Sequence, residues 1–354
     1  MLEAYLKHIS NNSFYVDDGY ITKSRNYVPS VRDKVCEYMR TSGPQTFDDL
    51  CQKFYNFPSN KIKNAISNDN RIIYIDKQTY CHAEFFNFEE DTLEKISDII
   101  SNSITQNGYM SARELWKNIK VKLPRVFEEN EALTTEYGLR NVLKWYLKGK
   151  FNFDTIISSK TNVYSLKRVF EEFCESRHIF TINDLEDLAK ELNSVIYFDN
   201  VYDKSFRINE NQFITDNELI FDTARIDASI ESFISDEYIT INDIHMFGTF
   251  PETNFPWNNY LLESYVSKYS QKLKLFHERF NAKVTIGAIV KKSANFNSYH
   301  EIIVDALAKS NIELKKDSAF DYLCMRGFLS CRQYKKIDEA IEKAQTLRKN
   351  VIRG

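Results

Sequence analysis

The sequence is poor in glycine and proline, and it contains no long apolar run. Nine glycines and six prolines among 354 residues are too few for a collagen-like or loop-rich all-β protein, so we expect a helix-rich one. The longest uncharged, mainly apolar run, Val284–Val290, is far shorter than a bilayer span. The first residues also lack the apolar core of a secretory signal. We therefore predict no membrane partner.

Cysteine patterns and catalytic motifs are sparse as well. The six cysteines are scattered without a Cys-x-x-Cys pair, which is typical of a reduced, intracellular protein, and we predict a cytoplasmic location. Cys81 and His82 are adjacent, but no second ligand pair stands at zinc-site spacing. Motifs for phosphate loops, dinucleotides, serine nucleophiles and zinc proteases are missing. We therefore predict a protein that is not an enzyme, with no catalytic residue, metal or cofactor.

The composition is nevertheless that of a folded protein. Forty-three per cent of the residues are hydrophobic and 27% are charged, a balance that can bury cores. A chain of this length is expected to form two or more compact domains.

Charge is distributed in blocks, although the net charge is only −3. Residues 1–90 carry a net charge of −1, residues 91–168 of +4, residues 169–260 of −14 and residues 261–354 of +8. An acidic block thus separates two basic ones. Such blocks are either solvated faces or local sites for oppositely charged partners, and the sequence leaves both open.

A short pattern occurs four times: a Ser or Thr, two residues, an acid, then an aliphatic residue. The copies begin at Thr46, Ser111, Thr181 and Thr240. A hydroxyl at this position caps a helix N-terminus, and the acid can reach back to the cap residue. Three copies have Asp in place of the usual Glu. In these copies we have less reason to expect the second bond of the motif, from the backbone N–H of the cap residue to the acidic side chain.

Each cap is preceded by apolar residues at helical spacing, and the caps recur at intervals of 65, 70 and 59 residues. After the first cap we predict a third helix over 59–67 and a β-hairpin over 71–81 that turns at 76–78. After the second we predict a helix over 137–147 and hairpin arms over 151–157 and 162–166.

Helix, turn, capped helix, third helix and hairpin is the order of elements in winged-helix domains, which the chain resembles. The predicted fold class is therefore mainly α with short β-hairpins, as tandem winged-helix modules plus a C-terminal helical segment. The predicted parts are an N-terminal extension (1–30), winged helix 1 (31–90), a basic winged helix 2 (91–168), an acidic winged helix 3 (169–223), winged helix 4 (224–295) and a C-terminal helical region (296–354).

Modules three and four depart from the pattern in different ways. In module three, no room is left for a third helix between Leu192 and the β-like stretch that begins at Val195, so we expect a degenerate, structural module. In module four we expect one helix over 260–280 and a strand over 284–290. Beyond residue 299 the sequence predicts helices over 299–310, 318–326 and 331–348.

Module two also resembles a narrower family. Over residues 92–168, the spacing of Ile99, Gly108, Met110, the Glu114-Leu115 pair and Ile119 is similar to that of the HARE-type winged helix, which is also found in the RNA polymerase delta subunit. The resemblance implies a winged-helix fold for this module.

The third helix of module two is the strongest candidate for nucleic-acid contact. Winged helices commonly place this helix in the DNA major groove and the hairpin near phosphate. Leu139, Val142, Leu143 and Tyr146 form one apolar face, and a separate row at four-residue spacing is basic. The predicted site residues of this module are Arg140, Lys144, Lys148, Lys150 and Lys160. Asn141 either is in position to reach a base edge or, as is usual for an exposed helical Asn, has no special role.

Module four supplies a second set of cations. Lys268 and Lys272 share a face of the predicted helix, and the set is completed by Lys274 and Arg279. Aromatic residues near the basic row, such as Trp145 and Phe151, either stack on bases or, as we favour, fill the core of the module.

Two hypotheses about function follow. The first is a non-enzymatic protein that binds double-stranded DNA through tandem helix-turn-helix modules, as a regulator or as the targeting subunit of a larger complex. The alternative is a scaffold for protein–protein interaction in a multi-subunit assembly with little DNA contact. In that case a partner binds through the acidic block 169–260 or through the C-terminal helices.

Overall fold

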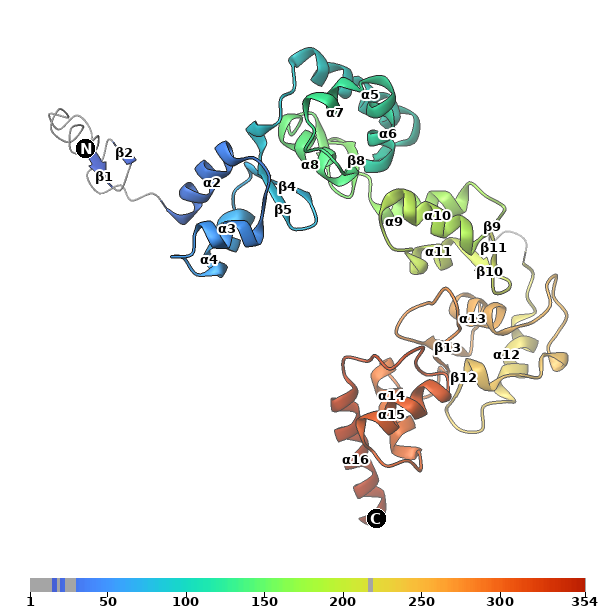
Figure 1. The fold of residues 1–354 in the computed structure, drawn as a ribbon. Helices are drawn as coiled ribbons and strands as arrows, with labels where there is room; N and C mark the ends of the chain where they lie inside the picture. Colours follow the sequence, from blue (N-terminus) through green and yellow to red (C-terminus); the bar gives the residue numbers. More distant parts are fainter. Residues whose placement is uncertain (1–14, 18–19, 23–29, 216–218, 354) are drawn as a thin grey trace. The chain divides into compact units, whose positions relative to one another are not determined.

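The computed structural model describes residues 15–17, 20–22, 30–215 and 219–353 (Figure 1). In this part of the chain it has fifteen α-helices, and its strands are at most five residues long and form small antiparallel sheets. The predicted class, mainly α with short β-hairpins, is confirmed. The chain divides into two compact units, Met1–Tyr164 and Ser165–Gly354. Within the described residues, no helix combines the length and the apolar character that spanning a bilayer requires.

Most of the predicted N-terminal extension lies outside the described residues. Its two described segments are the strands β1 (Tyr15–Asp17) and β2 (Tyr20–Thr22), which pair antiparallel.

The first module contains the elements that the sequence predicts. They are α2 (Val31–Ser42), β3 (Gln45–Thr46), α3 (Phe47–Lys53), α4 (Ser59–Ser67), β4 (Ile72–Asp76) and β5 (Thr79–His82). The sheet order is β3-β5-β4. The third helix over 59–67 is confirmed, because α4 has those bounds. The hairpin is confirmed as well, with Gln78 in the positive-φ conformation at its turn.

The second module follows the same order with one added short helix. Its elements are α5 (Glu90–Asn107), β6 (Tyr109–Ser111), α6 (Ala112–Lys122), α7 (Arg125–Glu129), α8 (Glu136–Tyr146), β7 (Phe151–Phe153) and β8 (Ile156–Ser159), with sheet order β6-β8-β7. The predicted hairpin arms are wrong, because the chain already turns at Asp154. The backbone N–H of Asp154 donates to the Ile156 carbonyl, and its carboxylate accepts from the Asn152 amide.

The third module is complete, which corrects the prediction of a degenerate one. Its elements are α9 (Leu166–Glu175), β9 (Ile179–Thr181), α10 (Ile182–Leu192), α11 (Phe198–Lys204), β10 (Ser205–Arg207) and β11 (Gln212–Thr215), with sheet order β10-β11-β9. Asn193 takes the left-handed conformation and ends α10, which leaves room for α11. The β-like stretch that begins at Val195 leads into that helix, which starts at Phe198, and Val201 and Tyr202 bury its inner face.

The fourth module differs most from its prediction. Its elements are α12 (Thr223–Glu231), β12 (Tyr238–Thr240), η3 (Ile241–Asp243), η4 (Phe247–Thr249), α13 (Asn259–Lys268), β13 (Leu273–Phe276) and β14 (Ala288–Lys291), with sheet order β12-β14-β13. The helix predicted over 260–280 ends at Lys268. The carboxylate of Asp227 accepts the backbone N–H groups of Gln271 and Lys272, which holds the chain in its turn toward β13.

The C-terminal region is helical, as predicted, with shifted boundaries. It contains α14 (Tyr299–Lys309), α15 (Lys316–Met325) and α16 (Ile337–Arg353). Their apolar faces share a core with Ala288 and Val290 of β14, so this region packs on the fourth module.

Three of the four predicted helix caps are confirmed. Thr46 and Thr181 form full capping boxes with Asp49 and Asp184, so Asp does make the reciprocal bond. The Ser111 hydroxyl accepts from the Glu114 backbone N–H. Thr240 does not cap an α-helix: a 3-10 turn follows it, and its side chain makes no cap bond.

The hairpin of module one contributes residues to two separate cores, that of its own module and that of module two. Ile72 of β4 packs with the helices of its own module, whereas Ile73 and Ile75 pack with Leu139 and Val142 of α8. The hairpin of the first module is therefore packed between its own helices and the third helix of the second module. This arrangement decides which face of α8 is exposed.

Candidate nucleic-acid interface

The first turns of α8 are fixed to β4 by hydrogen bonds and by close backbone approach. The hydroxyl of Thr135, the N-cap residue of α8, donates to the Ile75 carbonyl at 2.6 Å and accepts from the Gly138 backbone N–H at 2.9 Å. The side-chain amide of Asn141 donates to the Tyr74 carbonyl at 2.8 Å. A Cβ added at Gly138 would lie 2.4 Å from the Ile75 oxygen. This half of the helix is covered by the preceding module and cannot enter a DNA groove.

Asn141 therefore has a structural role that the sequence did not indicate. The prediction that it is in position to reach a base edge is wrong, because its amide is bound to the β4 backbone.

Arg140 is also separated from the basic row in which it was predicted. Its guanidinium donates to the Thr155 carbonyl at 3.2 Å and to the Asn141 side chain at 3.2 Å, and it lies 4.7 Å from the Tyr137 ring centre. Burial lowers the pKa of Arg140, although the group stays charged at neutral pH. These bonds tie α8 to the turn between β7 and β8, so Arg140 is only half exposed.

The C-terminal end of α8 is different, because Lys144 in its last turn and Lys148 just beyond the helix end are exposed. Among the described residues, no carboxylate forms an ion pair with either of them. The Lys148 ammonium lies 4.6 Å from the centre of the Trp145 ring. One cation thus lies on the last turn of α8 and the other in the turn that follows the helix.

The two remaining predicted residues of this module are exposed too. Lys150 lies between α8 and β7. Lys160 was expected at the tip of the hairpin, but it follows β8 because the hairpin turns earlier, at 154–155. Both remain available for phosphate.

A groove lies where the two modules meet. It has a volume of about 520 Å³, and we call it the inter-module groove. The polar and aromatic side chains that line it come from module one and from α8, and they include Asn70, Tyr74, Tyr80, Lys144, Trp145 and Lys148.

The carboxylate in this groove is already neutralised. The side chain of Asp69 is fully buried and accepts hydrogen bonds from Arg71 at 2.6 and 2.9 Å and from Arg32 at 3.1 Å. The Arg71 guanidinium holds the pKa of Asp69 well below its usual range, so it stays ionised and paired. The two lysines therefore leave the groove with positive charge.

The module-four cations do not form the predicted row. Lys268 is half buried and donates to the carbonyls of Asp203 and Ser205 at 3.1 and 3.3 Å. Lys272 lies beyond the helix end and pairs with Glu231 at 3.0 Å. Lys274 lies on β13 and donates to the Phe296 carbonyl at 2.6 Å. These residues do not lie on one helix face, because the helix on which they were predicted ends at Lys268.

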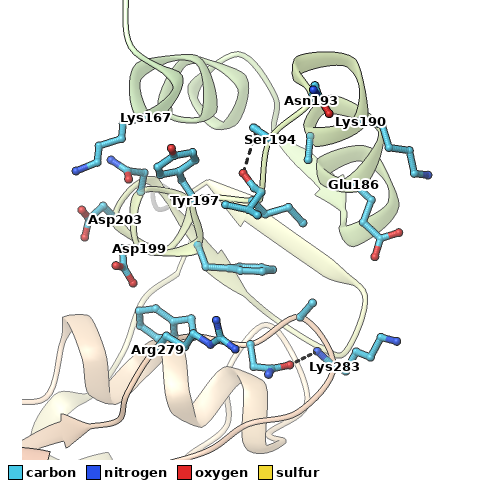
Figure 2. Close-up of a pocket in the computed structure, with 18 residues that line it drawn as sticks. Lys167, Glu186, Lys190, Asn193, Ser194, Tyr197, Asp199, Asp203, Arg279 and Lys283 are labelled. Carbon is cyan, nitrogen blue, oxygen red and sulfur yellow. Dashed lines mark hydrogen bonds between the residues drawn. The ribbon is translucent and has the colours of Figure 1, made fainter. Parts of the chain in front are cut away.

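Arg279 lies in the β13–β14 loop and lines a larger hollow of about 1110 Å³ in the second unit (Figure 2). Figure 2 shows Arg279 and Lys283 on the loop side, while Asp199, Asp203 and Glu186 come from the helices of module three. Because charges of both signs line this hollow, it does not have the character of a phosphate site.

The sequence did not indicate the aromatic side of the inter-module groove. Trp145 was interpreted as a core residue, and it is half buried with contact to the core, but it also faces the groove. Tyr74 and Tyr80 were assigned only to a hairpin. Nothing in the local sequence shows that this hairpin lies beside α8.

Comparison with known proteins adds no assignment to this geometry. The sequence matches no protein-family model and no curated protein.

Proposed function

We propose that this protein is a non-enzymatic DNA-binding protein whose first unit contacts phosphate, and that it serves as a regulator or as the targeting subunit of a larger complex. The observation that carries the proposal is the pair Lys144 and Lys148, which are exposed at the end of α8 and just beyond it and are free of carboxylate partners within the described residues. The order of helices and hairpin in each module supports the winged-helix interpretation.

The packing of α8 determines what kind of contact we propose. Since its first turns are covered by β4, the exposed lysines contact the phosphate backbone and do not carry α8 into the major groove. Phosphate contacts position a protein on DNA without reading sequence directly. Binding by this surface is therefore expected to depend strongly on salt and weakly on sequence.

The test is charge reversal at the two lysines, with a matched control. K144E/K148E is expected to weaken binding to a duplex by at least about tenfold, and to lower the slope of log K against log salt by about two units, since each phosphate contact contributes about 0.9. The control K120E/K122E makes the same charge change at exposed lysines of α6, outside the groove. Equal effects of both pairs, or none from K144E/K148E, would contradict the proposal.

The second unit favours the alternative function, a protein-interaction scaffold. Its segment 169–260 carries a net charge of −14, and three of its predicted phosphate ligands are engaged by its own carboxylate and carbonyl groups. We propose that this unit docks a basic protein partner.

The scaffold alternative has its own test. In E186K/D187K two acidic residues of α10 change sign, and Asp187 is 76% exposed. If the unit is a docking module, the variant loses a co-purifying partner while its thermal stability stays unchanged. If DNA binding is the function of the whole chain, this variant binds duplex DNA at least as tightly as the parent.

A further inference from the structure

The inter-module groove combines features that phosphate binding alone does not require. Two exposed lysines stand on its α8 side, and three aromatic side chains, Tyr74, Tyr80 and Trp145, also line it. Proteins that bind single-stranded nucleic acid pair a positively charged groove with rings on which bases stack. The groove has both parts.

The rings have an arrangement suited to flat ligands. Tyr74 and Tyr80 lie with ring centres 5.4 Å apart, and Tyr137 of α8 packs edge-on against Tyr74 at 5.4 Å. The Trp145 ring carries the Lys148 ammonium 4.6 Å from its centre. That cation is on an exposed, flexible side chain, so a base can replace it on the ring while the ammonium moves to a phosphate.

The volume of the groove indicates which kind of nucleic acid can enter it. A volume of about 520 Å³ is that of a small-molecule pocket, enough for a base with its sugar. A duplex keeps its bases stacked inside, and the packing of α8 on β4 prevents this helix from reaching them in the major groove. Only an unpaired strand can present the face of an internal base to these rings.

Polar groups at the groove add hydrogen-bonding capacity. Ser67 and Asn70, at the end of α4 and just beyond it, are exposed and line the groove. An exposed hydroxyl and an exposed amide can bond to the edge of an unpaired base.

From this combination we infer that the inter-module groove binds an unpaired stretch of nucleic acid, with a base stacked on Trp145 and the adjacent phosphates on Lys144 and Lys148. The inference rests on the proposed function and names its preferred ligand: a single-stranded tail or an opened region rather than a closed duplex.

The experiment compares a twelve-nucleotide oligo-dT, the matching RNA oligo-U and a dT·dA duplex of the same length by fluorescence anisotropy with the full chain. We expect the single strands to bind at least about tenfold more tightly than the duplex, because stacking of one base on an aromatic ring contributes about that factor to affinity. W145A is expected to remove most of that preference, and W145F, which keeps a ring, to retain it. If oligo-dT and oligo-U bind equally, the groove recognises the base and phosphate that DNA and RNA have in common. If one binds more tightly, that nucleic acid is the preferred ligand.

A second readout is the tryptophan fluorescence of the parent protein. Stacking of a base on Trp145 quenches its fluorescence during titration of the parent protein with oligo-dT, and W145F abolishes that quenching. The control W116F replaces a tryptophan that packs 4.4 Å from the ring of Phe127 and does not line the groove, so it retains the quenching.

The outcomes separate the two levels of the proposal. If duplex and single strand bind equally and K144E/K148E abolishes both, the groove inference fails while the proposed function stands. If the parent protein binds neither, both fail. A single-strand preference that survives in W145A, without quenching in the parent, also overturns the groove inference.

Discussion

The hydroxyl of Thr135 donates a 2.6 Å hydrogen bond to the carbonyl of Ile75, and so links the start of a third helix to the hairpin of the module before it. The second unit contains the same contact: Asn258, the N-cap residue of α13, donates to the Ile208 carbonyl at 2.7 Å. Six residues after the cap, a polar side chain again binds the preceding strand residue, as Asn141 does to Tyr74 and Ser264 to Arg207. Each unit is thus a pair of modules joined in the same way.

This joint makes a first prediction at Thr135. T135A removes both the cap bond to Gly138 and the bond to Ile75, and leaves a partly buried carbonyl without its partner. We expect the free energy of unfolding of the first unit to fall by about 1–3 kcal/mol, measured by urea denaturation. T135S keeps the hydroxyl and is expected to lose less than half of that. Equal losses in both variants would show that the hydroxyl is not what matters.

A second prediction concerns Gly138. Alanine in the middle of a helix is normally about 1 kcal/mol more favourable than glycine. Here the added Cβ would lie 2.4 Å from the Ile75 carbonyl oxygen, so α8 or β4 must shift. G138A is expected to lower the melting temperature of the first unit.

The control for Gly138 is G149A, since no atom lies within 4 Å of a Cβ added at Gly149. It is expected to leave the melting temperature nearly unchanged. A stabilised G138A protein would contradict the close approach of α8 and β4.

The third prediction concerns pH and the buried carboxyl of Glu263. Burial raises the pKa of Glu263 to about 7, although the Tyr202 hydroxyl donates to one of its oxygens at 2.7 Å. Its other oxygen is buried with no hydrogen-bond partner among the described residues. Nearby Arg207 donates to the carbonyls of residues 209, 210, 281 and 282.

Because the folded pKa lies above the unfolded value near 4.5, the contribution of Glu263 to stability is fully present below about pH 4.5 and is lost as pH rises to about 7. The full cost is about 3 kcal/mol. E263Q removes this titration, so the difference in unfolding free energy between E263Q and the parent is expected to grow in favour of E263Q over that interval. If this difference does not vary with pH, the predicted titration of Glu263 is wrong. Y202F removes the hydrogen bond from Tyr202, which lowers the pKa of Glu263 in the parent, so this variant is expected to extend the loss of stability to higher pH.

The fourth prediction concerns Asp69, whose contribution to stability changes with pH in the opposite direction. Hydrogen bonds from Arg71 depress the pKa of Asp69, so its contribution is present above pH 4 and is lost as pH falls. D69N is expected to destabilise the first unit by about 2 kcal/mol at pH 7, since both arginines are nearly half exposed and partly screened. The difference in unfolding free energy between D69N and the parent is expected to become smaller as pH falls, measured by denaturation of both proteins at each pH. A gap that widens at low pH would rule out the ion pairs as its cause.

Several features were determined by residues close together in the chain. Thr46, Ser111 and Thr181 were predicted as caps because a cap bond spans only three residues. Thr240 has the same local pattern but caps no α-helix, since the chain after it continues in 3-10 turns. Val195 and its neighbours looked like a strand from their β-branched and aromatic side chains, but they form the connector into α11, a helix whose Val201 and Tyr202 are buried.

By itself, the sequence determined the helical class, most of the element order and the exposed lysines near the end of α8, because periodicity and caps are written in neighbouring residues. Only the tertiary structure decided that Arg140 and Asn141 are engaged, that the module-four cations are separated, and that Trp145 faces a groove. Those outcomes depend on contacts such as that of Thr135 with Ile75, sixty residues apart, for which no local pattern exists.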